Sequence, residues 1–232
     1  MILSSLTQTR TSDDVADQLR ALIQSGELAK GDQLPPQREL ATTLGIGRQA
    51  LREALSMLEA LGYVETLRGA KGGTFVRDPV VASGQWLQQL RENIDELDQI
   101  LDFRIAIESE VAALAATRRD DDDLAAMKAA IDALPAESDR SRFRSADAQF
   151  HMSLARAARN GRLERAVRQA RADLFLPTDR ILFVTEIEST RDEHTAVLLS
   201  ITAGDAEHAR SEIRTHVEHT RRQVHGLIEA LS

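Results

Sequence analysis

The feature that most restricts the fold lies in the first third of the chain, where two short helical patterns precede a concentrated strand signal. The first pattern carries Leu40, Ala41 and Leu44, and the second begins at Arg48 after a Gly-Ile-Gly turn. Residues 63–77 then place runs with Val, Thr and Phe on both sides of a glycine-rich basic turn, which is typical of a β-hairpin. Two helices joined by a tight turn and followed by a hairpin predict a winged helix-turn-helix.

The rest of the chain has helical periodicity. A helix capped by Ser12 and stopped by Gly26 is expected before the helix-turn-helix. After the hairpin, apolar periodicity with proline, glycine and polar breaks predicts six or so antiparallel helices. We therefore expect a mostly α protein with an N-terminal winged helix-turn-helix domain (1–78), a linker (79–92) and a C-terminal antiparallel all-helical bundle (93–232).

Composition excludes several classes of protein. Of the 232 residues, 42% are hydrophobic, enough for one large core or two smaller ones, so the chain is not globally disordered. The absence of cysteine rules out disulfides, thiolate metal ligands and cysteine nucleophiles. Neither a secretory signal nor a run of about 18 apolar residues is visible, so we expect a cytoplasmic protein with no membrane partner.

The positive charge gathers on the predicted winged helix, although the net charge of the chain is −8. Residues 38–77 hold six basic against four acidic residues, and on the last helix before the hairpin two arginines lie one turn apart, opposite a leucine stripe. An arginine can bond two acceptors on a guanine edge or clamp a phosphate, whereas the plainer alternative is a solvated surface. The predicted contacts to double-stranded DNA are Arg38, Arg48, Arg52, Lys71 and Gly73.

The stretch LPPQRELATTLGIGRQALREALSMLEALGYVETLRGAKGGTFV resembles the N-terminal domain of the GntR family of bacterial transcription regulators, and the resemblance spans about residues 11–77. It implies operator contacts from Arg38, Arg48 and Arg52, with Gly73 at the wing tip. Pro36 and Gly47 stand where the family usually has serines before the two helices. Each loses a side-chain cap, at an expected cost below about 1 kcal/mol.

Four residues of the second part form a candidate metal site. Asp147 and His151 are four residues apart and project from one helix face. His194 and His216 lie 10 residues before and 12 after the turn that begins at Gly204, so antiparallel helices rising about 1.5 Å per residue bring them nearly level. One carboxylate and three imidazoles suit a divalent ion, zinc first, with nickel or manganese next. Buried polar residues that bond only to one another are the open alternative.

The remaining histidines have plainer expected roles. We expect surface or helix-end positions for His208, His219 and His225. His219 has a second possible role, because it lies three residues from His216 and could form a hydrogen bond with a metal-ligating residue.

Residues 93–228 resemble the ligand-binding domain of the FadR subfamily of GntR regulators. The resemblance implies that the Asp/His quartet holds a metal and, since members answering to fatty acyl-CoA lack this pattern, that the ligand is a small carboxylate. Arg104 matches the subfamily arginine that pairs with such a carboxylate. An ion pair with Glu108, four residues on, is its competing role.

The expected function is that of a homodimeric transcription regulator, typically a repressor, in which a carboxylate effector biases two arrangements of the DNA-reading domains. A metal-dependent hydrolase or another metalloenzyme is the alternative, because an open metal position can activate water. Against it, no further acid or base stands at a spacing that would serve the quartet, although Glu108 or Glu110 could be recruited, and an enzyme has no evident use for residues 38–77. We therefore expect no catalytic residues. A purely structural metal is the third reading.

Overall fold

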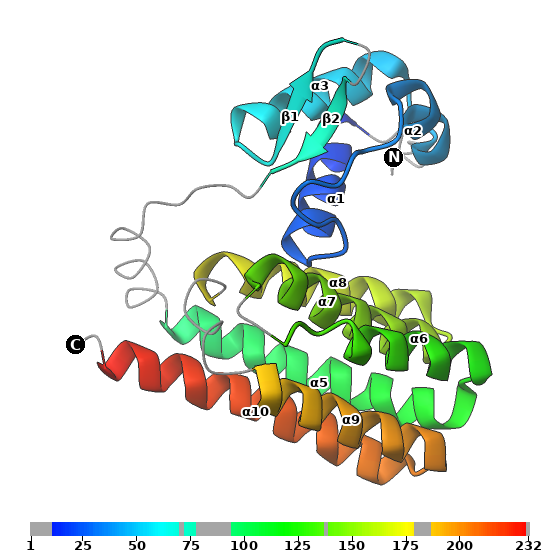
Figure 1. Ribbon diagram of the computed structural model, residues 1–232, viewed down its shortest axis with the longest axis vertical. Helices are drawn as coiled ribbons and strands as arrows, with labels where there is room; N and C mark the ends of the chain where they lie inside the picture. The colour runs from blue at the N-terminus through cyan, green and yellow to red at the C-terminus, as the bar shows by residue number, and fades with distance from the viewer. Residues whose placement is uncertain (1–10, 70–71, 78–93, 137–138, 179–186, 231–232) are drawn as a thin grey trace, which may run out of the picture. The chain divides into compact units, whose positions relative to one another are not determined.

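The computed structural model describes residues 11–69, 72–77, 94–136, 139–178 and 187–230. Its elements form two compact units with separate hydrophobic cores. Figure 1 shows short helices with a small hairpin in one unit and long helices in the other, which confirms the predicted fold class. The expected linker, residues 79–92, lies outside the described residues. Within the described ranges, no helix is long and apolar enough to span a bilayer.

The N-terminal unit has the elements of a winged helix-turn-helix: α1 (Ser12–Gln24), α2 (Gln37–Leu44), α3 (Arg48–Ala60), β1 (Val64–Leu67) and β2 (Gly73–Val76). The two strands are antiparallel, with Val64 opposite Val76. Gly45 ends α2 in the left-handed conformation (φ 67°), which permits the tight turn into α3. Pro36 and Gly47 precede α2 and α3 without a side-chain cap, as their residue types predict.

The start of α1 corrects one prediction. The backbone N–H of Asp14 donates to Thr11 Oγ1 (3.2 Å), and the backbone N–H of Thr11 donates to Asp14 Oδ2 (2.9 Å). This reciprocal pair is a capping box. The prediction that Ser12 caps the helix is therefore wrong by one residue, because Ser12 would need an acceptor at Val15 to close the same box.

The C-terminal unit contains six helices among its described residues: α5 (Ile94–Arg118), α6 (Asp121–Asp132), α7 (Arg140–Ala157), α8 (Gly161–Thr178), α9 (Ile187–Ala203) and α10 (Ala206–Ala230). In Figure 1, α5 and α10 run side by side along their length, and α5 packs more extensively on α10 than on any other helix. Small buried residues such as Ala112 and Ala116 allow helices to approach α5 closely. Asp120 caps α6 through a capping box with Asp123.

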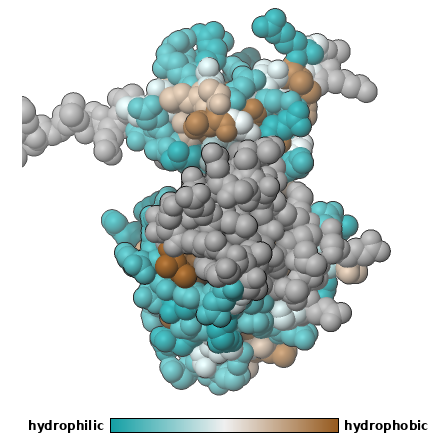
Figure 2. All heavy atoms as spheres, turned by 90° about the vertical axis from the view of Figure 1, so that its left-hand side faces the viewer, coloured by the Kyte–Doolittle hydropathy of each residue, from teal (hydrophilic) through white to brown (hydrophobic). Residues whose placement is uncertain are grey.

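The surface offers few large apolar side chains. The face seen in Figure 2 is mostly hydrophilic, with small hydrophobic areas among the described residues. Four large apolar side chains are exposed in the described ranges: Leu61, Leu67, Phe103 and Leu199. Scattered residues of this kind are normal on a protein surface, so function is better sought in the buried polar groups of the bundle.

Candidate metal centre and DNA-reading helix

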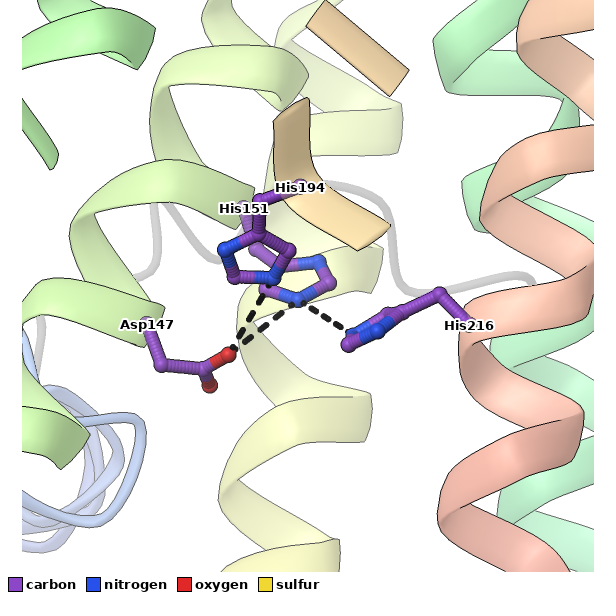
Figure 3. A group of neighbouring side chains, drawn as sticks. All are labelled: Asp147, His151, His194 and His216. Carbon is purple, nitrogen blue, oxygen red and sulfur yellow. Dashed lines mark hydrogen bonds and ion pairs between the residues drawn. The ribbon is translucent and has the colours of Figure 1, made fainter. Parts of the chain in front are cut away.

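Four side chains from three helices of the bundle point toward one another (Figure 3). Asp147 and His151 come from successive turns of α7, whereas His194 comes from α9 and His216 from α10. Gly204, with φ 75°, ends α9 and lets α10 fold back beside it, which brings the last two residues level. One ligand atom of each residue lies within 4.8 Å of the others, so the structure brings together all four predicted ligands.

The separations within this quartet suit a single ion. Asp147 Oδ1 lies 3.4 Å from His194 Nε2 and 3.6 Å from His151 Nε2, and His151 Nε2 lies 3.2 Å from His216 Nε2. Ligands placed about 2.1 Å from a tetrahedral zinc ion are about 3.4 Å from one another. These three separations match those of ligands around a first-row divalent ion, and the other donor pairs lie within 4.8 Å.

Two carboxylates form hydrogen bonds with the Nδ1 atoms of two of the imidazoles, on the side away from the quartet. His151 Nδ1 bonds to Glu108 Oε2 at 2.6 Å, and His216 Nδ1 bonds to Glu193 Oε2 at 2.7 Å. His219 Nδ1 also bonds to Glu193, as its spacing from His216 suggested. Burial would raise the pKa of Glu193, but the hydrogen bonds from these two histidines lower it, so the residue acts as a carboxylate acceptor.

These hydrogen bonds fix where the imidazole protons lie. A carboxylate can only accept, so His151 and His216 donate through Nδ1–H, and in a neutral ring Nε2 then carries a bare lone pair. Burial is the main cause that lowers the pKa of His216, which favours the neutral ring. When both rings are neutral, two Nε2 lone pairs face each other across 3.2 Å, an arrangement that repels unless a proton or a cation lies between them.

The surroundings of His194 provide independent evidence on whether the quartet binds a metal. Its side chain is fully buried and stacks on Phe150, with ring centroids 3.8 Å apart and an interplanar angle of 11°. Among the described residues neither ring nitrogen has a hydrogen-bond partner, which is costly for a buried polar group. Burial and the neighbouring His216 lower the pKa of His194 well below its usual range. A neutral imidazole that makes no hydrogen bond among the described residues and lies 3.4 Å from Asp147 Oδ1 fits a metal ligand better than it fits the alternative of hydrogen-bonded core residues.

Asp147 is held by an arginine that sequence reasoning missed. Arg171 on α8 pairs with Asp147 Oδ2 at 2.5 Å, while Oδ1 faces the histidines. Burial would raise the pKa of Asp147, but the charge of Arg171 and the neighbouring His151 hold it well below its usual range. No spacing connects Arg171 to Asp147, because they lie on different helices whose relative rotation the sequence does not reveal.

Arg104 forms an ion pair with Glu108, which was the alternative to its predicted role of binding a carboxylate effector. Its Nε lies 2.7 Å from Glu108 Oε1, and both side chains are buried. Burial would raise the pKa of Glu108, but Arg104 and His151 hold it well below its usual range. A guanidinium has several N–H donors, so a contact through Nε is compatible with binding a second carboxylate. That role for Arg104 stays a prediction.

The other two histidines lie away from the quartet. His208 is exposed and pairs with Glu212, and His225 pairs with Asp98 on α5. Both therefore have the surface roles that the sequence predicted for them.

The predicted DNA-reading arginines are exposed on the helix-turn-helix. Arg48 and Arg52 lie on α3 and Arg38 lies on α2, all three exposed to solvent. Arg52 Nη2 donates to Gln49 Oε1, and Gln49 Nε2 donates to Glu53 Oε1 at 2.8 Å. Sequence reasoning missed Gln49, although its place between two outward-facing arginines signals the same face of the helix.

The two wing residues have different outcomes. Gly73 begins β2, and a Cβ atom there would lie 2.3 Å from Nε2 of the flexible Gln33 side chain, so a larger residue would require that side chain to move. Lys71 lies outside the described residues. Their contacts with DNA stay predictions.

Comparison with known proteins places this arrangement in a family. Residues 11–76 match the family described as bacterial regulatory proteins, gntR family, and residues 96–219 match the FCD domain. The chain is 33% identical to an Escherichia coli (strain K12) protein named as a candidate regulator of the L-lactate dehydrogenase operon, over 90% of this chain and 84% of the relative. It is 30% identical to the HTH-type transcriptional regulator LutR of Bacillus subtilis (strain 168), over 90% of this chain and 98% of that protein.

A solved structure shares the fold. The E. coli protein McbR/YncC superposes with a TM-score of 0.58 over 93% of this chain and 97% of that one, at 18% identity. The similar proteins are regulators of transcription, so the chain is not an enzyme and the metalloenzyme alternative is set aside. With a gntR-family match over the winged helix and an FCD match over most of the helical bundle, this chain belongs to the GntR family of bacterial transcription regulators.

Proposed function

We propose that this regulator senses a small carboxylate through a divalent metal, zinc first, held by Asp147, His151, His194 and His216. The observation that carries the proposal is the close approach of the His151 and His216 Nε2 atoms, 3.2 Å apart, beside a buried His194 ring that has no hydrogen-bond partner among the described residues. A bound ion would be coordinated by both Nε2 atoms and would also satisfy His194. Its chemical contribution is a coordination position for a carboxylate oxygen.

The charges around the site favour an anionic effector. Arg104 pairs with Glu108 and Arg171 pairs with Asp147, so these four charges cancel within two contacts. A divalent ion therefore adds two positive charges, of which the carboxylate of Glu193, bonded to His216, balances one. Since an uncompensated charge is costly in a buried site, a carboxylate that reaches the ion and the Arg104 guanidinium would bind favourably. This ligand chemistry agrees with the role predicted for Arg104.

The DNA-binding half of the proposal rests on the exposed arginines of α2 and α3. We propose that Arg48 and Arg52 contact base edges in the major groove and that Arg38 contacts the flanking phosphates. We propose a homodimer, because two copies of one small domain match the two-fold symmetry of a palindromic operator. The effector then acts by binding one arrangement of the dimer better than the other, which in a repressor releases the operator.

A thermal-shift experiment tests the metal-dependent sensing. The full chain is stripped with a chelator and is then assayed with and without zinc against a panel of organic acids. L-lactate heads the panel because one relative is named for an L-lactate dehydrogenase operon. An effector at 100 times its Kd stabilises the folded state by about 2.7 kcal/mol, so a clear rise in Tm is expected for at least one acid in the zinc-loaded protein only.

Lactamide provides the matched control for lactate, because it replaces the carboxylate with a neutral amide of similar size. It should produce no shift. An acid that raises Tm equally in the stripped and the zinc-loaded protein would contradict metal-dependent sensing and would favour a purely structural metal.

A further inference from the structure

The buried carboxylate of Glu108 contacts two other buried functional groups at once. Its Oε1 accepts from Arg104 Nε at 2.7 Å, and its Oε2 accepts from His151 Nδ1 at 2.6 Å. Glu108 is 1% exposed, so water does not compete for either oxygen. One side chain thus joins the arginine predicted to bind the effector to one of the predicted metal ligands.

We propose that Glu108 is a positioning residue that holds His151 with Nε2 facing the metal position and ties this orientation to Arg104. The inference rests on the proposed function, and it assigns to α5 a part in metal binding although α5 contributes no ligand. Because Oε2 can only accept, His151 must donate through Nδ1–H and keep its lone pair on Nε2. Because Oε1 accepts from Arg104, a displacement of that guanidinium would also move the carboxylate that holds His151.

The substitution Glu108→Gln tests this geometry sharply. A carboxylate accepts from two donors, whereas an amide has a single oxygen and presents N–H groups on its other side. The amide of the variant could satisfy either Arg104 or His151 but would face the other with a donor. If the amide oxygen turns to Arg104, the amide nitrogen donates to His151 Nδ1, and the imidazole proton moves to Nε2, where it blocks the metal.

The first measurement is the zinc Kd of the full chain by competition with a chromophoric chelator. We expect Glu108→Gln to weaken zinc binding about 10- to 100-fold, the usual effect of losing a carboxylate behind a ligating histidine. Glu110→Gln is the matched control, because Glu110 lies on the same helix, is half exposed and pairs with Arg210 instead of a ligand. Equal zinc affinity in Glu108→Gln and Glu110→Gln would overturn the positioning role.

A rescue experiment tests the tie to Arg104. In the double variant Arg104→Met/Glu108→Gln, the amide no longer has to satisfy the guanidinium, so its oxygen can turn to His151. Zinc affinity should recover by at least about threefold over Glu108→Gln alone, a non-additive effect that is expected only for residues in contact. Purely additive losses would overturn the tie to Arg104.

The tautomer of His151 in the metal-free wild-type chain is a second readout that does not depend on how well a variant folds. Nitrogen-15 NMR should show the proton of His151 on Nδ1, and a proton on Nε2 would overturn the inference. If wild-type protein bound no zinc, the proposed metal site would fail, while the NMR result would still decide the role of Glu108. If wild-type protein bound zinc and Glu108→Gln bound it equally well, only this inference would fail.

Discussion

The His151→Ala/His216→Ala variant is expected to lose zinc binding at concentrations that saturate the wild-type chain. The two substitutions remove the nitrogens that face each other at 3.2 Å and leave only His194 and Asp147 as ligands. Zinc sites with four protein ligands bind with about 10–16 kcal/mol, so removing half of the ligands should weaken binding on the order of 10³-fold or more. Zinc per chain after dialysis, measured by atomic emission, should fall from near one to near zero.

The matched control is His208→Ala/His225→Ala, which removes the same number of imidazoles from positions that pair with Glu212 and Asp98 outside the quartet. This control should keep its zinc. Circular dichroism should show the same helical content in both variants, so that lost metal is not mistaken for lost fold. Full zinc occupancy in the His151→Ala/His216→Ala variant would contradict the proposed coordination.

The Arg52→Ala variant is expected to bind operator DNA about 10- to 100-fold more weakly than the wild-type chain. A guanidinium bonded to a base edge contributes about 1–3 kcal/mol of discrimination, and every 1.4 kcal/mol corresponds to a factor of ten. Arg52 is exposed on α3 and is held by Gln49, so its replacement leaves the core of the unit untouched. The operator is first selected from a random DNA library with wild-type protein, and fluorescence anisotropy then gives the Kd.

Arg20→Ala controls for the loss of one positive charge. Arg20 lies on α1, is partly exposed and pairs with Asp17. Its replacement should change operator affinity only slightly, and both proteins should lose affinity as salt rises, since phosphate contacts release counterions. Equal affinities for Arg52→Ala and wild-type protein would remove Arg52 from the interface.

The quartet could be predicted because its geometry follows from short-range rules. Asp147 and His151 share a helix face by their spacing, and the counts on both sides of the Gly204 turn place His194 and His216 level with each other. Both rules need only the rise and the periodicity of a helix. The turn between α2 and α3 could also be predicted from the local sequence, because Gly45 adopts the left-handed conformation that ends α2.

The charged residues that contact the four ligands could not be predicted in the same way. Glu108, Arg171 and Glu193 reach the site from three different helices, and their contacts depend on how each helix is rotated about its axis. Sequence reasoning considered Glu108 as a partner of Arg104, four residues away, and as an acid or base for an enzyme, but it missed the contact with His151, which lies 43 residues away. Tertiary packing, more than helix periodicity, therefore decides how a ligand is oriented.

The central claim is that one divalent ion binds at the meeting point of α7, α9 and α10. The most direct test is a crystal structure of the zinc-loaded chain with diffraction data collected on both sides of the zinc absorption edge. We expect one anomalous peak within about 2.0–2.2 Å of a carboxylate oxygen of Asp147 and of the Nε2 atoms of His151, His194 and His216. A zinc-loaded crystal with no anomalous peak among these four side chains would contradict the account.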